Sequence, residues 1–142
     1  MLYMHAAAYF RNMVNLKNDT FPDKLFTALI VEDDPDICYL LTGILNKKKL
    51  PSSFVNTLAE AEKALRKKAP DILILDNQLP DGLGVEFISF VKLNCPATRI
   101  IMITAHDTVP DRMNALNKGA DYFIGKPFTR ATINSTLENL IH

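Results

Sequence analysis

Hydrophobic positions along the chain alternate between short continuous runs and longer stretches with helical spacing. The short runs are rich in β-branched residues and predict strands at 26–31, 53–55, 72–75, 100–103 and 122–124. Apolar residues three or four positions apart predict helices at 35–47, 58–68, 85–93, 110–118 and 129–141. Two of the strands are apolar at nearly every position, which is typical of strands covered on both faces. The alternation therefore predicts one doubly wound α/β domain with a parallel sheet and helices on both sides.

Residues typical of helix ends stand at the predicted boundaries. Asp34 followed by Pro35 predicts an N-cap and a first helical residue. Thr57, with Glu60 three residues later, has the pattern of a capping box. Gly119 after a helical stretch predicts a helix end in the left-handed conformation. We assign these residues structural roles.

The first 25 residues differ from the rest and form an N-terminal extension to a domain at 26–142. The segment opens MLYMHAAAYF, which is apolar but short, and no Lys or Arg precedes it, so it does not fit a signal peptide. Residues 6–16 could form an amphipathic helix. Two interpretations stay open: an extension that the function does not need, or a helix used for packing or dimerisation.

Composition favours a single globular domain and argues against several other classes of protein. The 142 residues suit one domain, and a hydrophobic content of 48% is enough for a core. Lys plus Arg total 16 and Asp plus Glu total 16, so the charge balance gives no support for binding nucleic acid or an anionic membrane. No apolar run approaches the roughly 18 residues of a membrane span. Cys38 and Cys95 are too few for a disulfide framework or a zinc cage.

Polar side chains follow the predicted strands. They are Glu32 and Asp33 after the first strand, Asp76 after the third, Thr104 after the fourth and Lys126 after the fifth. Because parallel strands end at the same edge of a sheet, we expect three carboxylates, a hydroxyl and an ammonium group to converge there.

Clustered carboxylates repel one another, so the cluster predicts either a bound cation or raised pKa values. Mg²⁺ prefers oxygen ligands and takes one or two carboxylates together with waters or a phosphate oxygen. A carboxylate beside Mg²⁺ and a lysine can attack phosphorus and form an aspartyl phosphate. The chemistry that fits is phosphoryl transfer onto an aspartate.

Four segments resemble the receiver domain of bacterial two-component response regulators. They are ALIVEDDPDI, DILILDNQLPDGLG, IIMITA and GADYFIGKPF, which occur in the family's order and cover the chain from about residue 26 to residue 141. The resemblance implies a flavodoxin-like fold with five parallel strands in the order 2-1-3-4-5 and five helices.

The resemblance also implies a role for each acidic residue. Asp76 precedes the Leu-Pro-Asp-Gly turn and matches the phosphoacceptor. Asp33 matches a direct Mg²⁺ ligand, and Glu32 matches a residue that acts on the metal through water. Gln78 stands where a backbone carbonyl completes the metal shell.

Further positions match the residues that bind the phosphoryl group and respond to it. Thr104 matches the hydroxyl that moves toward the phosphoryl group, and Lys126 matches the lysine that binds one of its oxygens, with a cis bond to Pro127. Phe123 occupies the aromatic switch position, where the family often has Tyr. Gln78 and His106 occupy the positions that influence the lifetime of the phosphorylated state.

The resemblance implies a cytoplasmic signalling switch rather than an enzyme. A histidine kinase or histidine phosphotransfer protein would phosphorylate Asp76, and phosphorylation could promote dimerisation. Since the last predicted helix ends at 141, we expect either a stand-alone receiver or one cut from a longer regulator, with no nucleic-acid or membrane binding of its own.

Three other functions fit the sequence less well. A phosphatase of the haloacid-dehalogenase type would need a second Asp two residues after Asp76, where this chain has Gln78. A receiver that works without phosphorylation usually lacks an acidic residue or the lysine, and none is missing here. A flavodoxin would need a hydroxyl- and glycine-rich phosphate loop after the first strand, where the acidic run 32–34 would repel phosphate.

Overall fold

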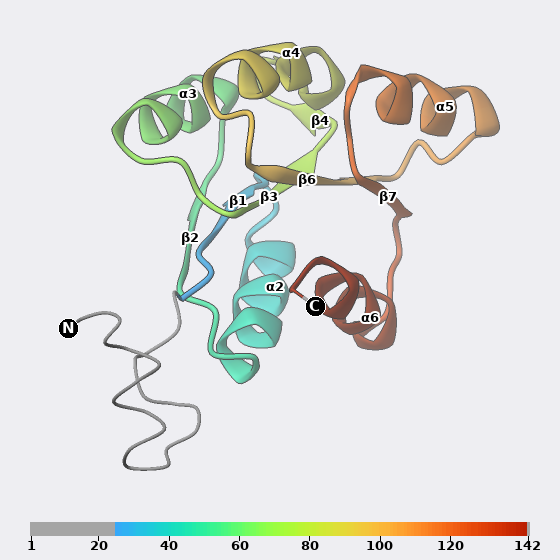
Figure 1. Cartoon of the computed structure of the whole chain (residues 1–142). Coiled ribbons are helices and arrows are strands. Elements are labelled where there is room, and N and C mark those ends of the chain that lie inside the picture. The colour runs from blue at the N-terminus through green and yellow to red at the C-terminus, as the bar shows by residue number, and fades with distance from the viewer. Residues whose placement is uncertain (1–24, 142) are drawn as a thin grey trace, which may run out of the picture.

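A five-stranded parallel sheet forms the centre of the molecule (Figure 1). The structure, a computed structural model, describes residues 25–141, so the predictions for residues 1–24 lie outside its range. The strands lie in the order β2-β1-β3-β6-β7, and each neighbouring pair is parallel. Their bounds are β1 (Ala28–Val31), β2 (Ser52–Val55), β3 (Ile72–Asp76), β6 (Arg99–Thr104) and β7 (Tyr122–Gly125). This order confirms the predicted 2-1-3-4-5 topology.

Five helices cover the two faces of the sheet (Figure 1). One face carries α2 (Pro35–Lys47) and α6 (Arg130–Ile141). The other carries α3 (Leu58–Lys67), α4 (Gly84–Asn94) and α5 (Val109–Lys118). The observed bounds of these helices and strands agree with the predicted ones to within two residues. The structure adds a small antiparallel pair, β4 (Gln78–Leu79) with β5 (Gly82–Leu83), whose strands are too short to produce a periodic pattern in the sequence.

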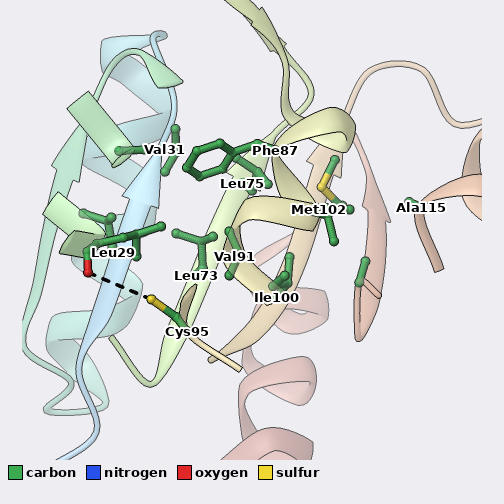
Figure 2. Packing of buried hydrophobic residues seen from close by; sticks show 14 of the residues in the cluster. Leu29, Val31, Leu73, Leu75, Phe87, Val91, Cys95, Ile100, Met102 and Ala115 are labelled. Atoms are coloured by element: carbon green, nitrogen blue, oxygen red, sulfur yellow. Dashed lines mark hydrogen bonds between the residues drawn. The ribbon is translucent and has the colours of Figure 1, made fainter. Parts of the chain in front are cut away.

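Side chains on the central strands alternate between two hydrophobic clusters. On β3, Leu73 and Leu75 face α3, α4 and α5, as Figure 2 shows, whereas Ile72 and Ile74 pack against α2 and α6. Cys95 belongs to the first cluster, and its Sγ donates a weak hydrogen bond to the backbone oxygen of Leu65 at 3.9 Å. Burial on both faces explains why this strand has no polar position before its last residue.

The predicted helix ends are present, with one difference. Asp34 Oδ1 accepts the Asp36 N–H at 2.9 Å, and Thr57 Oγ1 accepts the Glu60 N–H at 3.1 Å. The return bond expected in a capping box is absent in its usual form, because Glu60 Oε1 accepts the N–H of Asn56, one residue before the cap, at 2.9 Å.

A carboxylate from a distant turn also caps α3. Asp81, in the turn between β4 and β5, accepts the N–H of Leu58 at 2.8 Å and the N–H of Ala59 at 3.0 Å. These two hydrogen bonds hold the pKa of Asp81 below its ordinary value. They fix the turn that follows β3 against the start of α3.

Between residues 25 and 141, no helix is both long enough and apolar enough to cross a membrane.

Candidate functional site

Three carboxylates meet at the carboxyl edge of the sheet. Glu32 and Asp33 directly follow β1, and Asp76 ends β3, its neighbour in the sheet. Carboxylate oxygens of the three residues lie within 4.8 Å of one another. The Glu32 and Asp76 side chains are buried, whereas Asp33 is exposed. The structure therefore brings together the acidic residues that the sequence places at separate strand ends.

Lys126 forms ion pairs with both buried carboxylates. Its Nζ lies 3.0 Å from Glu32 Oε1 and 3.3 Å from Asp76 Oδ1. The lysine directly follows β7, and its bond to Pro127 is cis, as the resemblance implies. The cluster thus holds three carboxylates against one ammonium group, which leaves it with an excess of negative charge.

Burial dominates the titration of this cluster. It raises the pKa of Glu32 and of Asp76. The charge of Lys126 and hydrogen bonds from backbone N–H groups oppose this rise; for Asp76 these N–H groups include those of Asn77 and Gln78. Burial alone would lower the pKa of Lys126, but the hydrogen bond to Glu32 and the charges of Asp76 and Glu32 outweigh it and raise that pKa. The carboxylates therefore favour an additional positive charge.

The donor set fits a hard divalent cation. All three acidic groups present oxygen atoms, Asp33 is open to solvent, and the charge of Lys126 does not balance them. Mg²⁺ is bound in proteins by one or two carboxylates and keeps several waters, which fits a cluster of buried carboxylates with one member, Asp33, open to solvent.

We expect Mg²⁺ affinity to weaken as the pH falls. Because Glu32 and Asp76 have raised pKa values, protons compete with the metal at a higher pH than for ordinary carboxylates. Calorimetric titration should show that Mg²⁺ affinity decreases as the pH is lowered from about 7 to about 5. An affinity that stays constant over this interval would contradict the assignment of these ligands.

Asn77 and Gly84, whose roles no sequence pattern predicts, hold the backbone around Asp76 in place. Asn77 Oδ1 accepts the Val85 N–H at 2.8 Å, and the Asn77 backbone oxygen accepts the Gly84 N–H at 2.8 Å. A Cβ on Gly84 would overlap the backbone oxygen of Asp76. The start of α4 is thus packed directly on the backbone of Asp76, and only glycine allows this approach.

The acidic loop has a support of its own. Asn56, just beyond β2, donates from Nδ2 to the backbone oxygen of Glu32 at 2.9 Å. Asp34, the third acid of the run, is occupied as the cap of α2. Neither the partner of Asn56 nor that of Asn77 could be read from sequence, because polar residues that follow strands are common in loops.

The remaining candidate residues lie on β4, β6 and β7 and in the loop after β6. Thr104 ends β6 and is buried, and its Oγ1 accepts the backbone N–H of His106 at 3.1 Å. Phe123 is buried under α5, whereas Tyr122 packs on the opposite face of the sheet, as strand alternation predicts. Gln78 begins β4 with an exposed side chain, and the side chain of His106 is also exposed.

Comparison with known families settles which family this arrangement represents. The family model for the response regulator receiver domain matches residues 28–138. The chain belongs to this family. Receiver domains are the regulatory phosphoacceptor domains of two-component systems, and the strand-end acids and lysine lie within the matched segment.

Similar proteins include longer regulators. The receiver is 36% identical over 100 residues to the response regulator protein PilR of Pseudomonas aeruginosa, an alignment covering 70% of this chain and 22% of PilR. It is 32% identical over 114 residues to the transcriptional regulatory protein TrcR of Mycobacterium tuberculosis, covering 80% of this chain and 44% of TrcR. The chain therefore spans less than half the length of either relative.

Solved receiver structures share the fold. The beryllofluoride-activated NtrC4 receiver domain dimer superposes with a TM-score of 0.77 at 35% identity, covering 80% of this chain and 94% of that one. A CheY-like receiver domain protein from Methanospirillum hungatei superposes with a TM-score of 0.78 at 26% identity, covering 83% and 95%.

Proposed function

We propose that this receiver is a phosphorylation-controlled signalling switch that accepts a phosphoryl group on Asp76. The observation that carries the proposal is the position of the Asp76 carboxylate. It is buried, paired with Lys126 at 3.3 Å, and grouped with the oxygens of Glu32 and Asp33. A nucleophile, a cation site and a fixed ammonium group thus occupy one strand edge, which is the set that phosphoryl transfer needs.

Each residue has a defined task in the reaction. An Asp76 carboxylate oxygen attacks the phosphorus of a phosphohistidine, the P–N bond breaks, and the electron pair returns to the imidazole of the donor. Asp33 and Asp76 would ligate Mg²⁺ directly, with Glu32 acting through water and Gln78 through its backbone carbonyl. Mg²⁺ would neutralise the charge that develops on the phosphoryl oxygens.

Two further residues would read the phosphorylated state. Lys126 binds a phosphoryl oxygen from the position it already holds between the carboxylates. The Thr104 hydroxyl turns toward the new group, and Phe123 adjusts with it, which changes the surface formed by α5, β7 and α6. Gln78 and His106 border the approach of water to the phosphoryl group and set how long it lasts. Such a two-state response is a population shift driven by local charge.

The partners follow from this chemistry. The phosphoryl donor is a histidine kinase or a histidine phosphotransfer protein, and the domain works in the cytoplasm as a regulatory phosphoacceptor rather than as an enzyme with a released product. Phosphorylation favours dimerisation through the altered face. We assign the chain itself no nucleic-acid or membrane partner, because its net charge is zero.

Substitutions of two neighbouring aspartates, Asp33 and Asp34, test the proposed site. Beryllofluoride mimics a phosphoryl group on a carboxylate, and the protein should bind it only with Mg²⁺. Asp33→Asn removes a proposed ligand and should weaken Mg²⁺-dependent beryllofluoride binding by at least about tenfold. Asp34→Asn removes the same charge one residue later but keeps the helix cap, since Asn caps as well as Asp, and should change binding by less than about twofold.

Calorimetry or NMR titration distinguishes the two variants. No beryllofluoride binding by the unmodified protein, or equal losses in Asp33→Asn and Asp34→Asn, would contradict the proposed site.

A further inference from the structure

The Arg112 side chain joins three segments beside the proposed phosphorylation site. From α5, its guanidinium group forms an ion pair with Asp107 Oδ1 at 2.6 Å. The same group donates to the backbone oxygen of Phe123 at 3.1 Å, and its Cζ lies 4.9 Å from the centre of the Phe123 ring. One side chain therefore connects the loop after β6, helix α5 and strand β7.

Asp107 ties that loop to the end of β7. A Cβ on Gly125 would overlap the Asp107 carboxylate, so the carboxylate lies directly against this glycine, one residue before Lys126. Glycine at this position gives Asp107 the space to pack over the strand while it is held by Arg112. We call Arg112, Asp107 and Phe123 with these contacts the Arg112 latch.

The latch restrains Thr104 through the same short loop. Thr104 Oγ1 accepts the N–H of His106, whose next residue is Asp107. Rotation of Thr104 about χ1 would break this hydrogen bond, so the loop of His106 and Asp107, which Arg112 holds in place, opposes the rotation. A cavity of about 20 Å³ is lined by Thr104, His106 and Phe123 among others, so packing leaves some space for adjustment there.

We propose that Arg112 is a positioning residue that stabilises the unphosphorylated arrangement of the receiver. This inference rests on the proposed function, because it concerns how Thr104 reaches a phosphoryl group on Asp76. The latch contacts exist in the observed arrangement and oppose movement of the loop. Weakening them raises the population of the state that binds a phosphoryl group, and apparent affinity rises by the same factor.

The size of the effect follows from the exposure of the latch. The Arg112 and Asp107 side chains are 42% and 37% exposed, so water screens their ion pair. The contact of Arg112 with the Phe123 ring adds a cation–π interaction that is also partly solvated. We therefore expect a change of about three- to tenfold in apparent affinity rather than a change of several hundredfold.

The experiment compares two arginines with similar contacts. Arg112→Met keeps the aliphatic stem over Phe123 and removes the ion pair and the hydrogen bond. The control is Arg66→Met on α3, since Arg66 pairs with Glu62 at 2.9 Å and lies 5.1 Å from the centre of the Phe90 ring. Beryllofluoride is titrated into each protein at saturating Mg²⁺, and Mg²⁺ alone is titrated separately.

Arg112→Met should bind beryllofluoride about three- to tenfold more tightly than the unmodified protein, and Arg66→Met should bind it equally. Mg²⁺ affinity should not change in either variant, because neither arginine contacts the acidic cluster. Asp107→Asn should tighten beryllofluoride binding to a smaller extent, and adding it to Arg112→Met should have little further effect because both changes break one ion pair.

Several results would overturn the latch. Unchanged or weaker beryllofluoride binding in Arg112→Met would do so, as would equal tightening in Arg66→Met. Failure of the unmodified protein to bind beryllofluoride would instead count against the proposed function, so the two failures are distinguishable. Arg112→Met that does not fold is recognised by circular dichroism, and Asp107→Asn, a milder change in the same contact, then decides the outcome.

Discussion

Lys126→Met is expected to slow phosphorylation by acetyl phosphate by at least about 100-fold. The Nζ of Lys126 lies 3.0 Å from Glu32 Oε1 and 3.3 Å from Asp76 Oδ1, so it is already placed where a phosphoryl oxygen would arrive. Methionine retains most of the length of the side chain but cannot neutralise that charge. The rate is measured as the growth of the phosphorylated species by intact-mass spectrometry.

Lys48→Met is the matched control. Lys48 Nζ lies 3.0 Å from Glu138 Oε2, and its side chain is 22% exposed against 19% for Lys126, but it lies far from the acidic cluster. This variant should be phosphorylated within about twofold of the normal rate, since exposed ion pairs contribute little. A folded Lys126→Met protein that reacted as fast as Lys48→Met would contradict the proposed role of Lys126 in phosphorylation.

Gly84→Ala is expected to lower the free energy of unfolding by about 3 kcal/mol. The added Cβ would overlap the backbone oxygen of Asp76, and backbone atoms cannot move aside as the end of a flexible side chain can. The strain falls on the residue proposed to accept the phosphoryl group, so phosphorylation should also slow. Urea unfolding measures the stability, and the initial rate with acetyl phosphate measures the second effect.

Gly43→Ala makes the same chemical change where there is space for it. Gly43 lies within α2, and a Cβ there would meet nothing within 4 Å. Alanine is the better helix former, so this variant should be more stable by roughly 0.5–1 kcal/mol and be phosphorylated normally. Equal stabilities for the two variants would mean that α4 does not pack on Asp76 as described.

The arrangement of strands and helices could be predicted because burial leaves a strong pattern in the sequence. β3 is buried at all five positions, and its run of aliphatic residues ends in Asp76. The hairpin of β4 and β5 could not be predicted, since strands of two residues have no period. The helix cap supplied by Asp81 could not be predicted either, because Asp81 and Leu58 are 23 residues apart and only the tertiary structure brings them together.

For the candidate site, the residues that meet could be predicted from the sequence, but their detailed contacts could not. Parallel topology places Glu32, Asp76 and Lys126 at one edge, so their meeting followed from strand order. The pairing of Lys126 with both buried carboxylates and the packing of Gly84 on Asp76 depend on side-chain and backbone geometry that no sequence pattern encodes. The Arg112 latch is of the same kind, because an arginine on an exposed helix face is otherwise unremarkable in sequence.

The proposed acceptor can be tested most directly by intact-mass spectrometry after incubation with acetyl phosphate, with and without Mg²⁺. We predict one phosphoryl adduct that requires Mg²⁺, disappears in Asp76→Asn and persists in Asp81→Asn, whose aspartate lies in the following turn and caps α3. An adduct that persisted in Asp76→Asn, or that formed equally well without Mg²⁺, would contradict the assignment of Asp76 as the acceptor in a metal-dependent switch.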